Sequence, residues 1–475
     1  MNLLHKDYNI VSLNKSRKKN KKNKALLPFL ITFALVCIVG VTAVILLNVG
    51  KNGTFNMAWI WDGRSGSDTD ETELKRDATA KSGNISDKAG VSDTAGVSDT
   101  VGSSGAGTGL VIEKQSAASA AGDTAKTADK VKGKYDDILA DKTYMAQNGI
   151  YEKKASSADK ITLTFAGDIL FDSHYAVMSK LKGNGGQLDN SIDPAVLKIM
   201  NDSDLMMINN EFPYSDRGTP TSGKKYTFRA SPETASYLND MGVDIVSLAN
   251  NHAYDYGPDA LTDTFSTLDG AGVAYSGAGT DLSRAELPIS YIIDDKKITF
   301  ISATQIERND VPDTKAATDT NPGVFRCMDD TRLLDDIKKA KADSDYVIVF
   351  IHWGTENQET TDWLQEKQAP EIAAAGADLI VGDHPHCLQR IDYVGDVPVI
   401  YSMGNFWFNS KTVNTGLLQY TINKNGTPDL KFIPCLQKDC KTTLLSGADG
   451  ASLLDYMRSI SQNVSIDADG NVTAK

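Results

Sequence analysis

Cysteine is scarce in this chain, with five residues in 475, and no two of them form a CxxC pair. Without such pairs, a cysteine-based zinc site is not indicated. Cys435 and Cys440 lie close enough in the sequence to close a small disulfide loop, but the residues alone do not determine the connectivity. Two free buried thiols are an equally open alternative. Cysteine chemistry therefore gives no basis for predicting a function.

Beyond the first 24 residues, the sequence lacks a basic stripe. Residues 1–24 hold eight Lys or Arg and one acidic residue, Asp7, so this segment carries +7 and the remaining residues sum to −20. Nucleic-acid binding depends on clustered Lys and Arg that contact phosphates. We therefore exclude nucleic acid as the main partner, and the basic N-terminal segment indicates a membrane instead.

Charged residues are absent from residues 25–49, which are mostly apolar. As a helix this segment measures about 37 Å, enough to cross a hydrocarbon core of about 30 Å. A cleaved signal peptide is the alternative, but its apolar stretch is shorter and ends at a small-residue site that this segment lacks. Because positive flanks stay inside, we predict a single-pass cell-membrane protein with residues 1–24 in the cytoplasm and the C-terminal domain outside.

Aliphatic residues are sparse from 50 to 158, where the hexad Ala-Gly-Val-Ser-Asp-Thr also occurs twice in tandem, at 89–94 and 95–100. Such a segment cannot bury enough apolar surface to offset its ordering entropy. We predict a disordered, low-complexity extracellular linker that forms a stalk. Only residues from about 131 to 151 show mild helical character that could pack on the globular domain.

Residues 159–445 contain β-rich apolar runs separated by helical patterns. The predicted strands cover 161–167, 204–209, 243–249, 298–303, 346–351, 378–381 and 397–402. The predicted helices cover 232–238, 258–268, 329–340 and 362–375. Strands that alternate with helices predict an α/β architecture. Residues 446–475 are predicted to be a C-terminal tail with one helix, 451–460.

Polar side chains follow these strands at the points where they end. In α/β sheets the loops after the strand ends converge and present their side chains together. Carboxylate, amide and imidazole groups in such a position are suitable ligands for divalent metal ions. The sequence therefore predicts one metal site, formed by Asp168, Glu211, Asn251, His352, His384 and His386.

Each of these residues has a structural alternative when it is considered singly. Asp168 after a strand and a glycine is commonly a helix cap, and His352 alone is more often a packed core histidine. The pair His384 and His386 is harder to explain structurally, because an extended segment would place both imidazoles on one side. The combination of polar groups at six strand ends favours the metal site.

Six motifs lie in order along the predicted domain: Phe165-Ala-Gly-Asp168, Asn210-Glu-Phe-Pro213, Leu248-Ala-Asn-Asn-His-Ala-Tyr-Asp-Tyr-Gly257, His352-Trp-Gly-Thr-Glu356, Gly382-Asp-His-Pro-His-Cys-Leu-Gln389 and Tyr401-Ser-Met-Gly-Asn-Phe406. Together they resemble the CapA family of capsule or poly-γ-glutamate synthesis proteins, whose domain is similar to calcineurin-like metallophosphoesterases. The resemblance implies a metallophosphoesterase-like α/β/β/α sandwich over residues 159–445, preceded by one transmembrane helix and the disordered stalk.

The resemblance also implies roles for individual residues. Asp168 would take the first metal-ligand position, Glu211 the bridging position, and His252 the role of proton donor. The remaining ligands would be Asn251, His352, His384 and His386. The residues that would orient these groups are Asp255, Glu356 and Asn405. The cofactor would be a divalent metal such as Mn, Zn or Fe.

One departure from the family pattern leaves the number of metal ions open. Metallophosphoesterases usually begin with Asp-x-His, whereas Ile169 and Leu170 follow Asp168 in this chain. A missing histidine ligand weakens one of two metal positions, so a single ion and a more weakly bound pair are both open. His174 could compensate if its loop folds back.

The resemblance implies two alternative functions. The first is a membrane-tethered part of a polymer-synthase complex that takes part in the synthesis or export of poly-γ-glutamate or another envelope polymer. The second is an independent metal-dependent hydrolase, either a phosphoesterase or a γ-glutamyl amidase. Arg217 and Lys225 are predicted to bind the anionic substrate, with a solvated loop as the alternative.

Overall fold

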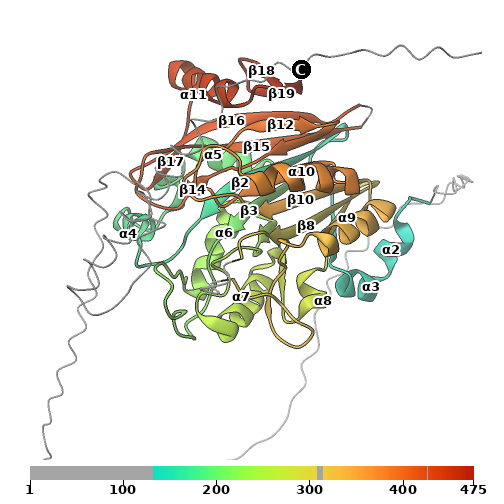
Figure 1. Ribbon diagram of the computed structural model, residues 1–475, viewed down its shortest axis with the longest axis horizontal. Helices are drawn as coiled ribbons and strands as arrows, with labels where there is room; N and C mark the ends of the chain where they lie inside the picture. Colours follow the sequence, from blue (N-terminus) through green and yellow to red (C-terminus); the bar gives the residue numbers. More distant parts are fainter. Residues whose placement is uncertain (1–131, 308–313, 425) are drawn as a thin grey trace, which may run out of the picture. The chain divides into compact units, whose positions relative to one another are not determined.

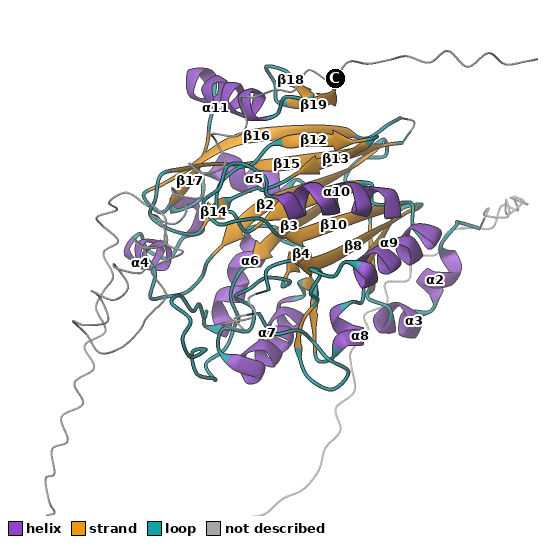
Figure 2. Cartoon of the chain, viewed as in Figure 1, coloured by secondary structure: helices purple, strands orange, loops and turns teal. Residues whose placement is uncertain are grey.

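A computed structural model describes residues 132–307, 314–424 and 426–475. The predicted cytoplasmic tail, the predicted transmembrane segment and most of the predicted linker lie outside these residues. Among the helices in the described ranges, none is both long enough and apolar enough to cross a membrane. The described residues form two large β-sheets with helices packed around them (Figure 1 and Figure 2).

The smaller of the two large sheets, sheet A, has seven strands in the order β1-β7-β8-β10-β11-β13-β12. Strands β8, β10, β11 and β13 run parallel, whereas β7 and β12 pair antiparallel with their neighbours β8 and β13. The bounds are β1 Ile150–Lys153, β7 Ile289–Ile293, β8 Lys296–Thr304, β10 Tyr346–His352, β11 Leu379–Asp383, β12 Ile391–Val394 and β13 Val397–Ile400.

Sheet B has ten strands, and its main path runs β18-β19-β16-β15-β2-β3-β4-β5, with β14 on β2 and β17 on β16. Strands β2 to β5 and β14 are parallel, and β15 to β19 form antiparallel pairs. The bounds are β2 Lys160–Ile169, β3 Leu205–Asn210, β4 Ile245–Ser247, β5 Ala274–Ser276, β14 Asn405–Trp407, β15 Val413–Asn423, β16 Asp429–Lys438, β17 Lys441–Leu444, β18 Val464–Ile466 and β19 Asn471–Ala474. A separate small ladder joins β6 Ala278–Gly279 and β9 Gly323–Val324.

Helices connect many of the strands, and local sequence signals mark some of their ends. The capping box of Asp362 and Gln365 starts α10, and Gly272 ends α7 in the left-handed conformation. The α-helices are α2 Asp136–Ala140, α3 Lys142–Gln147, α4 Ala176–Gly183, α5 Pro194–Asn201, α6 Ser236–Asp240, α7 Gly257–Ala271, α8 Leu282–Ala285, α9 Thr331–Asp343, α10 Trp363–Ala375 and α11 Gly447–Ile460. The short 3₁₀ helices are η1 Leu188–Asn190 and η2 Pro232–Ala235.

The two sheets pack face to face, and helices cover their outer faces. Leu163 and Phe165 of β2 meet Phe300 of β8 and Phe350 of β10 in a core between the sheets. Neighbouring strand residues such as Val349 point the other way and pack with α9 and α10, and a third cluster joins sheet B to α4–α7. Because both faces of each sheet are buried, the central strands appear in the sequence as continuous apolar runs. The layers therefore follow the predicted α/β/β/α order, with two mixed sheets.

The ordered domain is longer at both ends than the predicted bounds 159–445. Before it, Tyr135, Met145 and Ile150 pack against Ile292, so α2, α3 and β1 join the domain. After it, α11 contributes to the core between the sheets, and β19 pairs with β16. A few apolar residues are enough to attach these terminal segments, because the sheets of the domain supply the residues they pack against. The composition of the segments alone does not reveal those packing partners.

The described cysteines are all free thiols. Cys435 lies in β16 and Cys440 in the turn that follows, and both are buried. Burial raises the pKa of the Cys435 thiol to about 12. The sequence left open a disulfide between Cys435 and Cys440 or two free buried thiols, and in the structure both thiols are free and buried.

Candidate metal centre

Parallel strands of both sheets end at one edge of the domain, and the predicted ligands gather there. Sheet B supplies Asp168 from β2, Glu211 after β3 and Asn251 after β4. Sheet A supplies one histidine at the end of β10 and two after β11. These six side chains come from distant parts of the chain, and the order of the strands brings them into contact.

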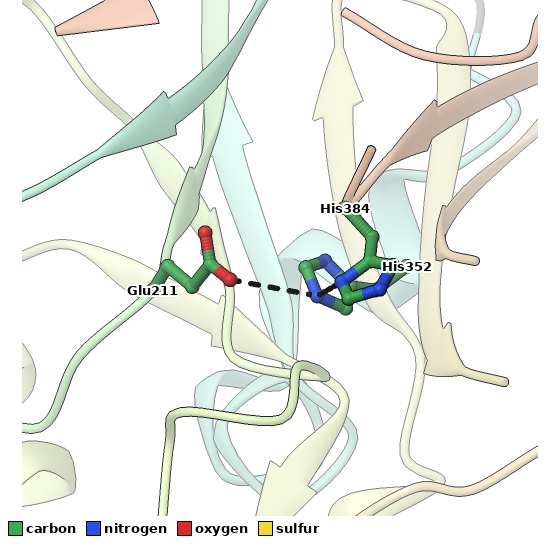
Figure 3. A group of neighbouring side chains, drawn as sticks. All are labelled: Glu211, His352 and His384. Carbon is green, nitrogen blue, oxygen red and sulfur yellow. Dashed lines mark hydrogen bonds and ion pairs between the residues drawn. The ribbon is translucent and has the colours of Figure 1, made fainter. Parts of the chain in front are cut away.

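One group of candidate ligands contains Glu211, His352 and His384 (Figure 3). Glu211 Oε1 lies 3.7 Å from Nε2 of His352, and this nitrogen lies 3.0 Å from Nδ1 of His384. Oδ1 of Asn251 lies 2.8 Å from the same His352 nitrogen. Carboxylate, amide and imidazole groups thus meet around one point, as the ligands of a single metal ion do.

A second group contains Asp168, Glu211 and His386, whose candidate ligand atoms all lie within 4.8 Å of one another. His386 Nδ1 lies 2.9 Å from Oδ2 of Asp168 and 3.0 Å from Oδ1 of Asn405. Asn405 thus contacts a candidate ligand. Glu211 belongs to both groups, so its carboxylate occupies a position from which it could bridge two ions.

Gly167 allows Asp168 to lie beside the loop that leads into β14. A Cβ atom at Gly167 would come within 1.8 Å of the carbonyl oxygen of Gly404, so no larger residue fits. The backbone N–H of Asp168 donates to that oxygen at 3.0 Å. This close approach pairs Asp168 with Asn405 in the sheet and places both beside His386.

Three carboxylate oxygens in the centre are buried without a hydrogen-bond partner in the described structure. They are both oxygens of Glu211 and Oδ2 of Asp383. Burial raises the pKa of both carboxyl groups well above the usual range, and the charge of Asp168 raises it further. Buried, unpaired carboxylates are costly unless a cation compensates them. The residues present therefore fit a bound divalent metal ion.

The imidazoles of the two groups have different electrostatic surroundings. Burial lowers the pKa of His352 well below its usual value, and the neighbouring His384 lowers it further. His352 is therefore neutral at physiological pH, which is the form that binds metal. Burial also lowers the pKa of His386, but the bond to Asp168 and its charge outweigh this, so the net pKa is raised.

The imidazole of His252 faces the first ligand group and is held in place by Asp255 and Phe228. Its Nε2 lies 4.0 Å from Glu211 Oε1, and its Nδ1 lies 2.7 Å from Oδ2 of Asp255. The imidazole stacks on the ring of Phe228, with centroids 4.1 Å apart and planes 29° apart. A carboxylate accepts the proton of Nδ1, so Nε2 is the nitrogen directed at the candidate metal ligands.

Asp255 is itself held by two donors. Lys224 forms an ion pair with it, and the backbone N–H of Phe228 donates to it at 2.7 Å. Burial raises the pKa of Asp255 to about 7, against the opposing effect of Lys224. The chain Lys224, Asp255 and His252 therefore resembles the arrangements that orient a catalytic imidazole.

His384 and His386 do not lie on an extended segment. Their φ angles are 104° and 58°, in the left-handed region. The two rings consequently join different groups, since His384 contacts His352 and His386 contacts Asp168. The prediction that an extended backbone directs both rings to one side is wrong, because a tight turn follows β11 in place of a continuing strand. Such backbone strain is commonly found at functional sites.

Two predicted residues lie at or beyond the periphery of the centre. Glu356 is exposed, and its charge contributes to raising the pKa of His386. The His174 side chain is 62% exposed, and Nδ1 lies 2.8 Å from Oδ1 of Asp172. His174 belongs to neither ligand group, so its loop does not supply the histidine that the family pattern lacks here.

The predicted substrate-binding cations point to other partners. Arg217 forms two hydrogen bonds to Asp263, and the Nζ of Lys225 lies 4.8 Å from the ring centroid of Tyr226. Lys224, the neighbour of Lys225, is the lysine that reaches the centre, with its side chain only 7% exposed. The sequence could not separate these adjacent lysines, because local residue type does not show which of them turns inward.

Two further polar residues belong to the centre, although neither was predicted to be a site residue. Asp383 supplies an unpaired buried oxygen, and Asn209 donates to Asp168 Oδ1 at 2.7 Å. Asp383 stands inside the motif at 382–389, and Asn209 directly precedes the motif at 210–213, at the ends of β11 and β3 respectively. Their position at strand ends was the available signal.

Known proteins resemble this chain over the region that carries the candidate ligands. A family model described as "Bacterial capsule synthesis protein PGA_cap" matches residues 162–410, which include all candidate ligands. "PGA biosynthesis protein CapA" of Bacillus subtilis (strain 168) is 32% identical over 286 residues, which covers 59% of this chain and 73% of that protein. "Capsule biosynthesis protein CapA" of Bacillus anthracis is 30% identical over 286 residues, with coverages of 58% and 67%.

Solved structures give weaker similarities. The protein TT1561 of Thermus thermophilus matches with 10% identity and a TM-score of 0.31, over 56% of this chain and 99% of that one. The 5'-nucleotidase from Candida albicans SC5314 matches with 9% identity and a TM-score of 0.35, over 60% of this chain and 53% of that one. Scores this low carry no argument, so the architecture rests on the chain's own sheets and cores.

Proposed function

Because the chain belongs to the bacterial capsule synthesis protein family PGA_cap, we propose that it takes part in the synthesis or export of poly-γ-glutamate or a similar capsule polymer. The observation that carries this proposal is the family match over residues 162–410, which spans both candidate ligand groups. The uncharged apolar segment 25–49 supports a location at the outer face of the cell membrane. A membrane complex that makes the polymer is the corresponding partner.

The metal centre would act on or hold the polymer. Asp168, Glu211 and His386 would hold one divalent ion, and Glu211 would also belong to the second set, with Asn251, His352 and His384. A divalent ion there supplies Lewis acidity, which polarises a bound carbonyl or phosphoryl group and acidifies water. Each set would keep at least three candidate ligands although the Asp-x-His pattern is missing.

The chain's own residues would handle the proton. Asp255 accepts from Nδ1 of His252 and so keeps Nε2 directed at the ligand groups. Lys224 and the stack on Phe228 hold this pair in place. When protonated, His252 donates from Nε2 to a leaving oxygen or nitrogen, and Asp255 stabilises the resulting imidazole orientation.

The arrangement of His252 also favours a second candidate function, an independent metal-dependent hydrolase. A buried imidazole that is held by a carboxylate and lies 4.0 Å from a candidate metal ligand is built for proton transfer. Simple polymer binding would not need this arrangement. The substrate would be a phosphoester or the amide bond of a γ-linked glutamate chain.

Metal content and turnover of the purified full-length chain test both candidates. The wild type is compared with His384→Ala and with His174→Ala, a control histidine outside the ligand groups. We expect stoichiometric divalent metal in the wild type and in the control, and less in His384→Ala. Binding of a γ-glutamate oligomer without turnover supports the polymer role, and turnover lost in His384→Ala supports the hydrolase. A wild type without bound metal, polymer binding or turnover overturns both.

A further inference from the structure

A hollow lies away from the metal ligands, between α4, η1 and the turn from β16 to β17. It has a volume of about 340 Å³. Three lysines line it: Lys180 from α4, and Lys438 and Lys441 on either side of the turn. Labels for α4 and β17 mark this region in Figure 1. A lysine-lined hollow is notable in a chain whose formal charge is −13.

Lys438 and Lys441 are direct partners in the antiparallel register of β16 and β17. Side chains that face each other in this way lie on the same side of the sheet, and two like charges there destabilise the pair. The turn between them, Asp439 and Cys440, has φ angles of 51° and 63°. Non-glycine residues rarely adopt this conformation, so backbone strain accompanies the charge repulsion.

Neighbouring carboxylates do not neutralise these lysines. Within residues 132–307, 314–424 and 426–475, none of the three forms an ion pair, although Asp439 also lines the hollow. Lys180 lies near enough to lower the pKa of the Cys440 thiol, against the larger effect of burial, which raises it. With three lysines and one aspartate in its lining, the hollow carries a net positive charge, which suits an anionic ligand.

We propose that Lys180, Lys438 and Lys441 form a binding site for an extended polycarboxylate chain, separate from the metal ligands. This inference rests on the proposed function, because the polymer concerned carries one carboxylate per γ-linked residue. A chain of carboxylates can contact these lysines together, although they come from three elements, α4, β16 and β17.

Strand β14 links this site to the metal centre. Asn405 at its start contacts His386, and two residues later the indole of Trp407 donates to the carbonyl oxygen of Cys440 at 2.9 Å. Thr442 donates from Oγ1 to the carbonyl oxygen of Phe406 on the same strand. A polymer held by the lysines would therefore be anchored within the same rigid unit as the candidate metal ligands.

Binding of a fluorescent γ-linked glutamate oligomer to the full-length chain in mild detergent tests the proposal. The variant Lys438→Glu/Lys441→Glu is compared with Lys160→Glu/Lys424→Glu, which makes the same charge change at the opposite end of β2 and β15. We expect at least about tenfold weaker binding for the first variant and less than about twofold for the second, since screening limits distant charges. Lys438→Gln/Lys441→Gln, which removes charge without reversal, should give an intermediate loss.

Two further measurements make the outcome decisive. His174→Ala, at an exposed histidine outside both ligand groups, should bind the oligomer as the wild type does, and a neutral, amidated oligomer of the same length should not bind. Oligomer binding that is unchanged in both lysine variants overturns this inference alone and leaves the proposed function standing. A wild type that binds no oligomer overturns the inference together with the polymer role. Matching thermal melts of variants and wild type confirm that the variants fold.

Discussion

The metal centre and the lysine hollow both gather like charges, but they do so in opposite environments. The carboxylates of Asp168, Glu211 and Asp383 are fully buried, and two of these groups retain oxygens without a partner. The ammonium groups of the hollow belong to side chains that water reaches. Water screens the second set and cannot screen the first.

This difference sets the size of the effects that each region should produce. A buried, unpaired charge is costly, so the metal centre should depend strongly on a bound cation. Exposed like charges cost little, so the hollow can remain open without its ligand and bind it reversibly. The metal centre is therefore expected to need a bound cation at all times, whereas the hollow is expected to act as a docking surface.

Removing the shared carboxylate should give the largest change. Glu211→Gln should abolish metal binding, because both ligand groups contain Glu211, whereas His386→Ala should disturb only one group. Metal content measured by elemental analysis separates these results. Glu233→Gln, at an exposed glutamate, serves as the control. Equal metal content in Glu211→Gln and the wild type would contradict the shared role.

Disturbing the support of His252 should reduce turnover without removing metal. If the chain is a hydrolase, Asp255→Asn should lower kcat by about 10²–10³-fold, because the amide no longer fixes the proton on Nδ1. Metal content should stay at the wild-type level. A matched loss of metal would instead show that Asp255 supports the ligands and not the proton transfer.

Metal binding should stabilise the fold measurably. With free metal at 100 times its Kd, the stabilisation should be about 2.7 kcal/mol, and a chelator should reverse it. Thermal melts with and without metal measure the shift. Glu211→Gln should show no shift, and Lys438→Glu/Lys441→Glu should show the full one. A metal-induced shift that the lysine variant loses would mean that the two regions are not independent.

The smallest effect should come from the hollow itself. Without ligand, Lys438→Ala should stabilise the chain by about 0.2–1 kcal/mol, because it relieves the repulsion with Lys441 across the strands. The midpoint of urea unfolding at low salt measures this gain, and high salt should reduce it. Lys424→Ala is the control, and a loss of stability in Lys438→Ala would contradict the repulsion.

Sequence patterns identified the strands that carry the site with good accuracy. The predicted runs 161–167, 204–209, 346–351 and 378–381 correspond to β2, β3, β10 and β11. Their continuous apolar composition reflects burial on both faces, which is a strong signal. The antiparallel hairpin of β15 and β16 was not predicted, because its residues are more mixed in polarity and its pairing depends on a sheet already formed.

The chemical groups of the site can be recognised in the amino-acid sequence, because the carboxylate, amide and imidazole groups stand directly at strand ends. Their division into two ligand groups depends on the folded arrangement of the strands. Asp168 and His386 lie 218 positions apart and meet because of the order of the strands, and Glu211 is shared because β3 ends between the two sets. Contacts of this kind are set by global packing, which no local pattern of residues encodes.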